Sequence, residues 1–245
     1  RGQVMKLLLH ACCGPCTLEP LRLLLEEGHK ISIAYMNSNI QPKTEYDHRL
    51  ETLLAFARDQ GIEVIEGVYD AHAWATRVGS YGPSSETRPD RCRACYRLRL
   101  EEAAAYAAAH GFDGLATTLT VSPYQYTAVI GEELADVCAA HGLAPVFHDY
   151  RENYAEATRR SREMGMYRQD YCGCGFSKVE ADDERTMRAA ERARAKAERE
   201  IRLAPIKAQK ERELAARRAE KQEYASRRAR QRAALKEYKK THENR

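Results

Sequence analysis

The amino-acid sequence predicts an α/β protein, in which a parallel sheet carries helices on both faces and a helical extension follows. Short apolar runs alternate with amphipathic helical segments over residues 6–164, and this alternation is typical of parallel sheets. After residue 177 aromatic and β-branched residues become rare, while Ala, Arg, Glu and Lys dominate. That composition favours a long helix with little apolar face. We therefore expect an α/β domain over residues 1–177 and a basic helical tail over residues 178–245.

Strands and helices are expected to alternate along the α/β domain. The strands are expected at residues 6–11, 31–35, 62–68, 112–118 and 143–148. The helices are expected at residues 18–28, 44–60, 71–78, 91–110, 122–141 and 153–164. Thr17 and Asn153 are predicted N-caps, and Ser122-Pro123 is a predicted helix start. In the tail, Pro205 is expected to break or kink the helix and so to divide it into two pieces.

The charge is divided unevenly between the two parts. The whole chain has 40 Lys and Arg against 36 Asp and Glu, a net charge of +4. Residues 178–245 hold 22 Lys and Arg against 13 Asp and Glu, which leaves 18 against 23 in residues 1–177. A basic tail fits a nucleic-acid partner, because Lys and Arg displace counterions from phosphate, and it equally fits a solvated charged helix.

The sequence predicts a cytoplasmic protein without a membrane partner. No apolar run approaches the ~20 residues of a membrane span, and the N-terminal residues show no secretion signal. In the cytoplasm, eight cysteines favour metal binding or redox chemistry over a structural disulfide framework. Cys138 lies in an amphipathic helical pattern, where a core position is expected.

The remaining cysteines are candidate metal ligands in three clusters. The first follows a predicted strand, the second has helical spacing that puts both thiols on one face, and the third is a Cys-Gly-Cys pair. For the second cluster, zinc binding, iron–sulfur binding and a redox role all stay open. For the third, a strained disulfide and a pair of metal ligands both stay open. Seven thiols exceed the four of a structural zinc or an iron–sulfur cluster, so a redox metal site is the leading hypothesis. The clusters are Cys12, Cys13 and Cys16; Cys92 and Cys95; Cys172 and Cys174.

Several ordered motifs carry a resemblance to a known family. They are LHACCGPC from Leu9, YMNSNIQP from Tyr35 followed by Glu45-Tyr46 and Arg49, CRACYRLRL from Cys92, TTLTVSPY from Thr117, and YCGC from Tyr171. Over about residues 5–177 the chain resembles the cobalamin-independent epoxyqueuosine reductases of the QueH type. The tail is not part of that pattern. The resemblance also implies a fold similar to the adenine-nucleotide-hydrolase-like, Rossmann-like enzymes.

The resemblance implies an oxidoreductase of tRNA processing that performs the last step of queuosine biosynthesis. An epoxide on the modified base at the wobble position, in the anticodon loop, is reduced to an alkene, with electrons from a donor that the sequence does not identify. The family is iron–sulfur dependent. The resemblance implies that Cys12, Cys13, Cys92 and Cys95 ligate a [4Fe-4S] cluster and that Cys172 and Cys174 form a redox-active pair. The role of Cys16 stays open, because some members of the family carry a carboxylate at that position. Alternatively, Cys16 together with Cys172 or Cys174 ligates a second, mononuclear iron.

Other residues near these motifs are candidates for proton transfer and substrate binding. Removing an epoxide oxygen as water takes two electrons and two protons, so an acid is expected nearby. Tyr171 and Asp170 are the candidates, whereas His10 is expected to be structural. Aromatic and polar side chains in predicted strand-end loops and helix starts are expected to bind the extruded base, although ordinary loop roles stay open. They are Tyr35, Asn37, Asn39, Tyr46, Ser122, Tyr124 and Gln125.

Two alternative functions remain open from the sequence. The first is a tRNA sulfur transferase of the same fold, but cysteines occupy the place of the Ser-Gly-Gly-x-Asp-Ser phosphate loop of such enzymes, which disfavours ATP chemistry. The second is a non-enzymatic, zinc-stapled RNA-binding module. In each case the basic tail is a candidate contact for the RNA backbone.

Overall fold

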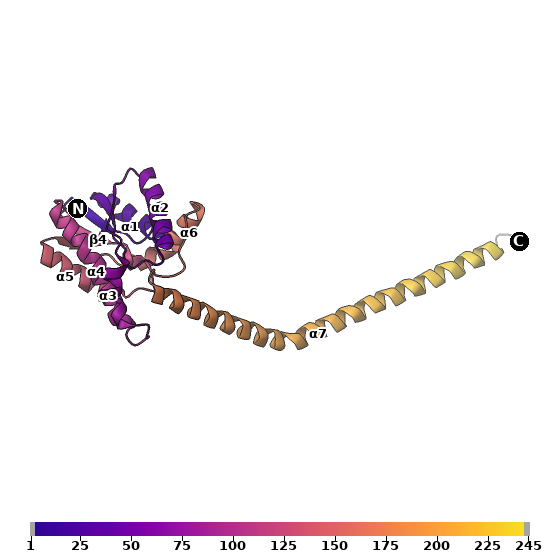
Figure 1. Cartoon of the computed structure of the whole chain (residues 1–245). Coiled ribbons are helices and arrows are strands. Elements are labelled where there is room, and N and C mark those ends of the chain that lie inside the picture. The colour runs from indigo at the N-terminus through magenta and orange to yellow at the C-terminus, as the bar shows by residue number, and fades with distance from the viewer. Residues whose placement is uncertain (1–2, 243–245) are drawn as a thin grey trace. The chain divides into compact units, whose positions relative to one another are not determined.

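The structure is a computed structural model, and it describes residues 3–242. The outermost residues of the two predicted parts, 1–2 and 243–245, lie outside the described residues. The chain divides into two units, Arg1–Asp182 and Asp183–Arg245, and Figure 1 colours it from indigo at the N-terminus to yellow at the C-terminus. Within the described residues, no helix has the length and apolar character needed to cross a membrane.

The first unit contains the predicted parallel sheet, in the order β3-β2-β1-β4-β5. The central strand pairs with neighbours on both sides, and its residues Leu7, Leu8 and Leu9 are fully buried. The chain runs from β1 to β2 on one side of β1 and later places β4 on the other side of β1. The carboxyl ends of β1 and β4 therefore form a topological switch point, which is where such sheets bind ligands. The strands are β1 Lys6–His10, β2 Lys30–Tyr35, β3 Val64–Glu66, β4 Gly114–Thr117 and β5 Ala144–Val146.

Helices cover both faces of the sheet, as predicted. Alternate residues of a strand point to opposite faces, so Leu7 and Leu9 pack with α1 and α2, while Leu8 packs with α4 and α5 (Figure 1). Cys138 of α5 is fully buried in the second of these cores, which confirms its predicted core position. The helices of the first unit are α1 Gly14–Glu26, α2 Lys43–Asp59, α3 Ala71–Arg77, α4 Arg88–Ala109, α5 Thr127–His141 and α6 Tyr154–Glu163.

Two predicted helix starts are wrong, and both errors lie near the thiols. α1 begins at Gly14, with Cys13 as its N-cap, because Pro15 suits a first turn; Thr17 lies inside the helix and its hydroxyl donates to Cys13 O at 2.7 Å. α5 begins at Thr127 instead of Ser122-Pro123. Bonds from α4 hold the residues just before Thr127 in a non-helical loop, as the site geometry below shows.

The remaining boundaries differ little from expectation. α4 begins at Arg88, three residues earlier than predicted, with Pro89 in its first turn. Asn153 holds the N-cap position of α6 but makes no side-chain capping bond. Three 3-10 turns complete the unit, at Gly79–Tyr81, Leu119–Val121 and Tyr150–Asn153.

The tail forms one helix, α7, over Gly175–His242. It begins inside the first unit and makes up the described part of the second. Pro205 lies within it and does not end it, so the predicted break is wrong, while Figure 1 shows a bend along this helix, in line with the alternative of a kink. Proline removes only one hydrogen bond, and the strong helix formers on both sides of Pro205 keep the helix continuous.

Candidate active site

The first cysteine cluster lies where β1 ends and α1 begins. Cys12 follows the strand, Cys13 caps the helix in an extended conformation, and Cys16 lies in the first helical turn. Their three Sγ atoms all lie within 4.8 Å of one another, and those of Cys12 and Cys13 are 3.8 Å apart. The Gly14-Pro15 sequence therefore brings adjacent thiols to one point, as expected, and the group can hold a metal ion.

These three thiols hold their protons unequally. The Cys13 and Cys16 thiols bond to Cys12 and hold its pKa well below the usual range, with help from the Arg99 guanidinium. Burial raises the pKa of Cys13, and the contacts with Cys12 and Cys13 raise that of Cys16. The geometry thus favours one thiolate beside two neutral thiols. Metal ligation requires thiolates, and Cys12 is the thiol of the three whose surroundings favour loss of the proton.

Gln169 contacts this group from the end of the first unit. Its Nε2 lies 2.8 Å from Cys13 Sγ and 3.8 Å from Cys16 Sγ. Its buried Oε1 has no hydrogen-bond partner among the described residues. An amide N–H directed at a thiolate stabilises the negative charge, so Gln169 adds a donor to the group.

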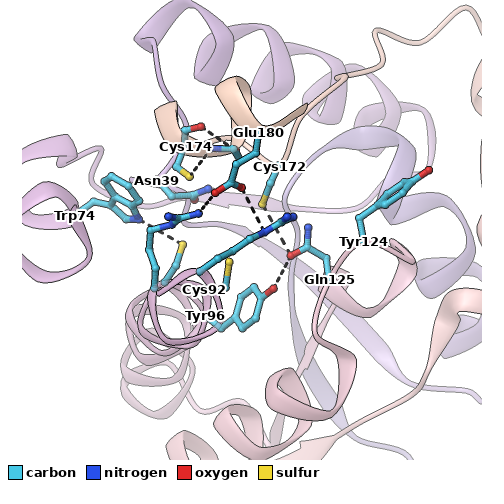
Figure 2. Close-up of a pocket in the computed structure, with 13 residues that line it drawn as sticks. Asn39, Trp74, Cys92, Tyr96, Tyr124, Gln125, Cys172, Cys174 and Glu180 are labelled. Carbon is cyan, nitrogen blue, oxygen red and sulfur yellow. Dashed lines mark hydrogen bonds and ion pairs between the residues drawn. The ribbon is translucent and has the colours of Figure 1, made fainter. Parts of the chain in front are cut away.

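The second and third cysteine clusters meet in one pocket (Figure 2). Cys92 and Cys95 reach it from α4, and Cys172 and Cys174 reach it from the segment that precedes α7. All four are free thiols, so the redox pairing of Cys172 with Cys174 stays a prediction. The other lining residues are Asn39, Trp74, Arg88, Arg91, Tyr96, Tyr124, Gln125, Ser177 and Glu180.

Of the two thiols of α4, Cys95 is buried and Cys92 is half-buried, and these surroundings favour the neutral form of both. Burial, followed by the nearby Cys172, raises the pKa of Cys92 to about 12, and burial raises the pKa of Cys95 to about 11. Trp74 donates its indole N–H to Cys95 Sγ at 3.4 Å, which fixes the position of that sulfur. A metal bound here would displace the protons, as metal binding to thiols does in general.

The backbone around Cys172 is held by a buried arginine of α2. Arg49 is 1% exposed, is paired with Glu45 at 2.7 Å, and donates to the carbonyl oxygens of Cys172 at 2.8 Å and Tyr171 at 3.1 Å. The loop after β2 adds a further bond, from Gln41 N to Gly173 O at 2.9 Å. The third cysteine cluster therefore occupies a fixed place.

Glycine is required between the two cysteines for two reasons. Gly173 has a φ of 149°, which L side chains rarely adopt. A Cβ at this position would also lie 2.9 Å from Asn39 Nδ2 and 3.0 Å from Ile40 Cγ1. The Cys-Gly-Cys sequence thus lets the backbone approach the loop after β2.

A tyrosine of α4 holds the loop that forms the rim of the pocket. Tyr96 OH donates to Gln125 Oε1 at 2.6 Å and accepts from Tyr126 N at 3.4 Å, and Cys172 Sγ lies 3.9 Å from the same Gln125 oxygen. Figure 2 shows Gln125 between Tyr96 and Cys172. These bonds explain why α5 does not begin at Ser122.

The two thiol groups lie within the field of one buried cation. Arg99 favours the thiolate form of Cys12, Cys95 and Cys172. Cys12 and Cys92 also pack against the same apolar cluster. Cys92 and Cys95 nevertheless lie outside the group of three within 4.8 Å, so the ligand set Cys12, Cys13, Cys92 and Cys95 stays a prediction.

Three residues predicted to bind substrate are buried. Tyr35 and Tyr46 have ring centroids 4.8 Å apart, and Tyr35 OH donates to Tyr46 O at 2.9 Å. Asn37 donates to Ala11 O at 2.9 Å and accepts from Arg99 at 2.5 Å. These side chains support the loops around the thiols. Contact with a base would require them to leave the core, and that role stays a prediction.

The other predicted substrate residues lie near the pocket. Asn39 lines it, is buried, and has an Oδ1 atom without a hydrogen-bond partner among the described residues. Tyr124 lines the rim and is 57% exposed. Ser122 is half-buried and its hydroxyl accepts from Tyr124 N at 3.4 Å. Asn39 and Tyr124 therefore line the pocket and Ser122 supports Tyr124, and their contact with a substrate stays a prediction.

The predicted acids lie outside the thiol pocket. Tyr171 and Asp170 line a second, open hollow beside α2. Tyr171 OH donates to Gln41 O at 2.6 Å, and burial raises its pKa. Direct proton donation into the thiol pocket would require both side chains to move, so their catalytic role stays a prediction.

His10 has the structural role that the sequence predicts. It is fully buried, with Nδ1 3.1 Å from Thr117 Oγ1 and Nε2 3.3 Å from Met36 O. Burial, with the nearby Arg99, lowers its pKa to about 3. The neutral ring thus links the ends of β1, β2 and β4.

Sequence reasoning missed four residues of the site. Arg99 lies one helical turn after Cys95, and that spacing could have revealed it. Arg49 stands in a quoted motif, but nothing in the sequence assigned it a role. Trp74 and Gln169 contact thiols 21 and 156 residues away in the chain. Sequence spacing carries no signal for such contacts.

The fold and the site define a class: α/β proteins that hold a group of thiols able to bind a metal ion at the sheet edge where related folds bind phosphate. Within that class, the chain belongs to the family described as "Epoxyqueuosine reductase QueH", which matches residues 7–180. The family is one of reductases, so the resemblance stated from the motifs is confirmed, and the sulfur-transferase and RNA-binding-module alternatives are not favoured.

Curated relatives are similar over most of their own length. A protein of Dehalococcoides mccartyi is 34% identical over 182 residues, which cover 71% of this chain and 93% of the relative. A protein of Thermotoga maritima is 32% identical over 178 residues, with 71% and 90% covered. A protein of Haemophilus influenzae is 33% identical over 183 residues, with 70% and 71% covered. Each is named epoxyqueuosine reductase QueH.

Proposed function

We propose that this chain reduces epoxyqueuosine in tRNA to queuosine, with the reaction in residues 1–177. The observation that carries the proposal is the convergence of four thiols in one pocket, beside a group of three more, within the segment that matches the reductase family. The anticodon loop would present the base to the rim formed by Asn39, Tyr124 and Gln125.

The donor set fits an iron–sulfur cluster. Its seven thiols are buried or half-buried, Cys12 favours the thiolate form, and Arg99 offsets negative charge on both groups. Cys12, Cys13, Cys92 and Cys95 would hold a [4Fe-4S] cluster, which supplies single electrons. Cys16, with Cys172 or Cys174, is the alternative ligand set for a second, mononuclear iron.

The Cys172–Cys174 pair would supply the electrons and protons that the reaction consumes. Breaking two C–O bonds of the epoxide to give an alkene and water takes two electrons and two protons. Oxidation of two thiols to a disulfide releases two electrons and two protons. Two electrons from an external donor and two protons would return the pair to thiols, and a cluster held by the neighbouring cysteines would supply such electrons singly. Burial, followed by the nearby Cys174, raises the pKa of Cys172, so this thiol carries its proton.

The test is single-turnover reduction by anaerobically purified protein. Incubation with tRNA that carries epoxyqueuosine should yield a nucleoside that has lost one oxygen atom, detected by mass spectrometry after digestion. Cys172→Ala and Cys174→Ala should abolish the product, and Cys138→Ala should preserve it. A colourless, zinc-loaded protein that leaves the epoxide intact would contradict the proposal.

A further inference from the structure

The positive charge of α7 is confined to its distal part. Residues 178–200 hold 7 Lys and Arg against 7 Asp and Glu, whereas residues 201–245 hold 15 against 6. The excess of positive charge is strongest over residues 224–240, which contain 7 basic residues and a single acidic one. The net charge of +9 in the tail therefore belongs to the distal part alone.

Three arginines of the distal part have no acidic neighbours along the helix. Arg188 pairs with Glu184 at 3.1 Å and Arg194 pairs with Glu198 at 3.3 Å in the proximal part. By contrast, no acidic residue stands three or four positions from the distal arginines Arg228, Arg230 and Arg232. Helix geometry offers these three no intrahelical acidic partner; Arg228 lies over the Tyr224 ring, 5.9 Å from its centroid.

This arrangement works against an isolated helix. Arg228, Arg232 and Lys236 follow one another at i, i+4 spacing, and like charges at that spacing are destabilising. The described side chains of residues 204–238 are all exposed, so burial in a core does not compensate. A bound polyanion would remove the repulsion, which indicates that these cations serve a partner.

The pattern fits the backbone of RNA better than a lipid surface. A membrane-surface helix has a broad apolar face opposite its cations. Here Arg230 lies roughly 200° around the helix from Arg228, at about 100° per residue, so the cations surround the helix. Phosphate contacts need charge and reach without an apolar face.

We propose that residues 201–238 bind the sugar–phosphate backbone of the substrate tRNA, away from the modified base. This inference rests on the proposed function for the choice of RNA. The segment lies beyond residues 7–180, which match the reductase family, so it is a property of this chain. The contact supplies affinity independent of base sequence, with a strong dependence on salt concentration.

The test compares two triple variants of the full chain. The distal variant is Arg228→Gln, Arg230→Gln and Arg232→Gln; the matched control, in the proximal part, is Arg188→Gln, Arg194→Gln and Arg199→Gln. Affinity for an unmodified tRNA transcript is measured from 50 to 300 mM salt. At low salt, the distal variant should bind tRNA with an affinity that is lower by roughly tenfold or more. The slope of its log affinity against log salt concentration should be shallower by about 2–3. The control should change neither, and circular dichroism checks that both stay helical.

Equal losses in both variants, or none in either, would overturn the inference. So would an unchanged tRNA affinity in a distal variant that has lost binding to phosphatidylserine vesicles, since the partner would then be a lipid surface. Because the transcript carries no epoxide, a failure of the proposed reductase activity leaves this measurement intact. Conversely, a chain that reduces epoxyqueuosine but binds tRNA equally well in all three forms would retain the proposed function and refute only this contact.

Discussion

At the scale of single residues, the structure shows why a glycine separates the last two cysteines. Gly173 combines a φ of 149° with contacts that leave no space for a Cβ. Gly175, two residues on, has no such φ, and a Cβ there would meet Gln41 Oε1 at an ordinary 3.7 Å. The two positions make a matched pair for mutation.

We expect Gly173→Ala to lower the free energy of unfolding by about 1–3 kcal/mol and to abolish epoxide reduction, because the backbone would displace Cys172 and Cys174. Urea denaturation and the tRNA reduction assay measure the two effects. Gly175→Ala should leave both nearly unchanged. Full activity in Gly173→Ala would show that the pair does not need this backbone position.

Gln169 provides a second test at this scale, through its N–H directed at Cys13 Sγ. With Cys13 as a cluster ligand, this donor stabilises the reduced form, because hydrogen bonds to ligand sulfur raise the reduction potential. We expect Gln169→Leu to retain its iron and to shift the midpoint potential lower, on the order of tens of millivolts. A redox titration followed by electron paramagnetic resonance measures the shift, and an unchanged potential would exclude this role.

At the scale of elements, α4 presents Cys92, Cys95, Tyr96 and Arg99 on successive turns. Tyr96 also holds the rim loop through Gln125 and Tyr126. One helix therefore positions two thiols, a cation and the loop at the rim of the pocket.

Removing the Tyr96 hydroxyl should loosen that loop. We expect Tyr96→Phe to cost about 1–2 kcal/mol, because it leaves Gln125 Oε1 and Tyr126 N without this partner, and to raise the KM for tRNA more than it lowers kcat. Hydrogen exchange of residues 122–126 and steady-state kinetics measure the effects. Tyr106→Phe on the same helix, which does not line the pocket, is the control; equal effects of the two changes would contradict this role for Tyr96.

The sequence predicted the elements better than their junctions. Apolar runs such as Leu7-Leu8-Leu9 are determined by burial between two layers, so all five strands and both helical layers were predictable. The start of α1 was missed because Cys13 caps it without a side-chain bond. The burial of Tyr35 and Tyr46 was missed because the sequence does not distinguish an aromatic residue at a strand end that packs in the core from one that lies at the surface. The contact of Gln169 with Cys13 depends on the tertiary fold alone.

At the scale of the whole molecule, seven of the eight cysteines gather at one edge of the sheet and the eighth, Cys138, lies in the core. A metal held by the seven should stabilise the folded chain, because the unfolded chain lacks the site. We expect removal of iron under anaerobic conditions to lower Tm, and reconstitution with iron and sulfide to restore it.

Cysteine variants make that experiment specific. Cys138→Ala should show the same metal-dependent change in Tm as the unaltered chain, although its own Tm falls through loss of core packing. Cys12→Ala should lose most of the change together with its iron. A Tm that is independent of iron in the unaltered chain would mean that the thiols hold no stabilising metal.

The contact between Gln169 and Cys13 spans 156 residues, and the bond between Arg49 and Cys172 spans 123. During synthesis, the first three thiols therefore leave the ribosome long before their last neighbours. A cluster delivered to the nascent chain at that stage would find an incomplete site, whose thiols are exposed to oxidation and to adventitious zinc. A cluster site that needs these contacts would be complete only after residue 174 has left the ribosome, so loading would follow synthesis of the α/β domain.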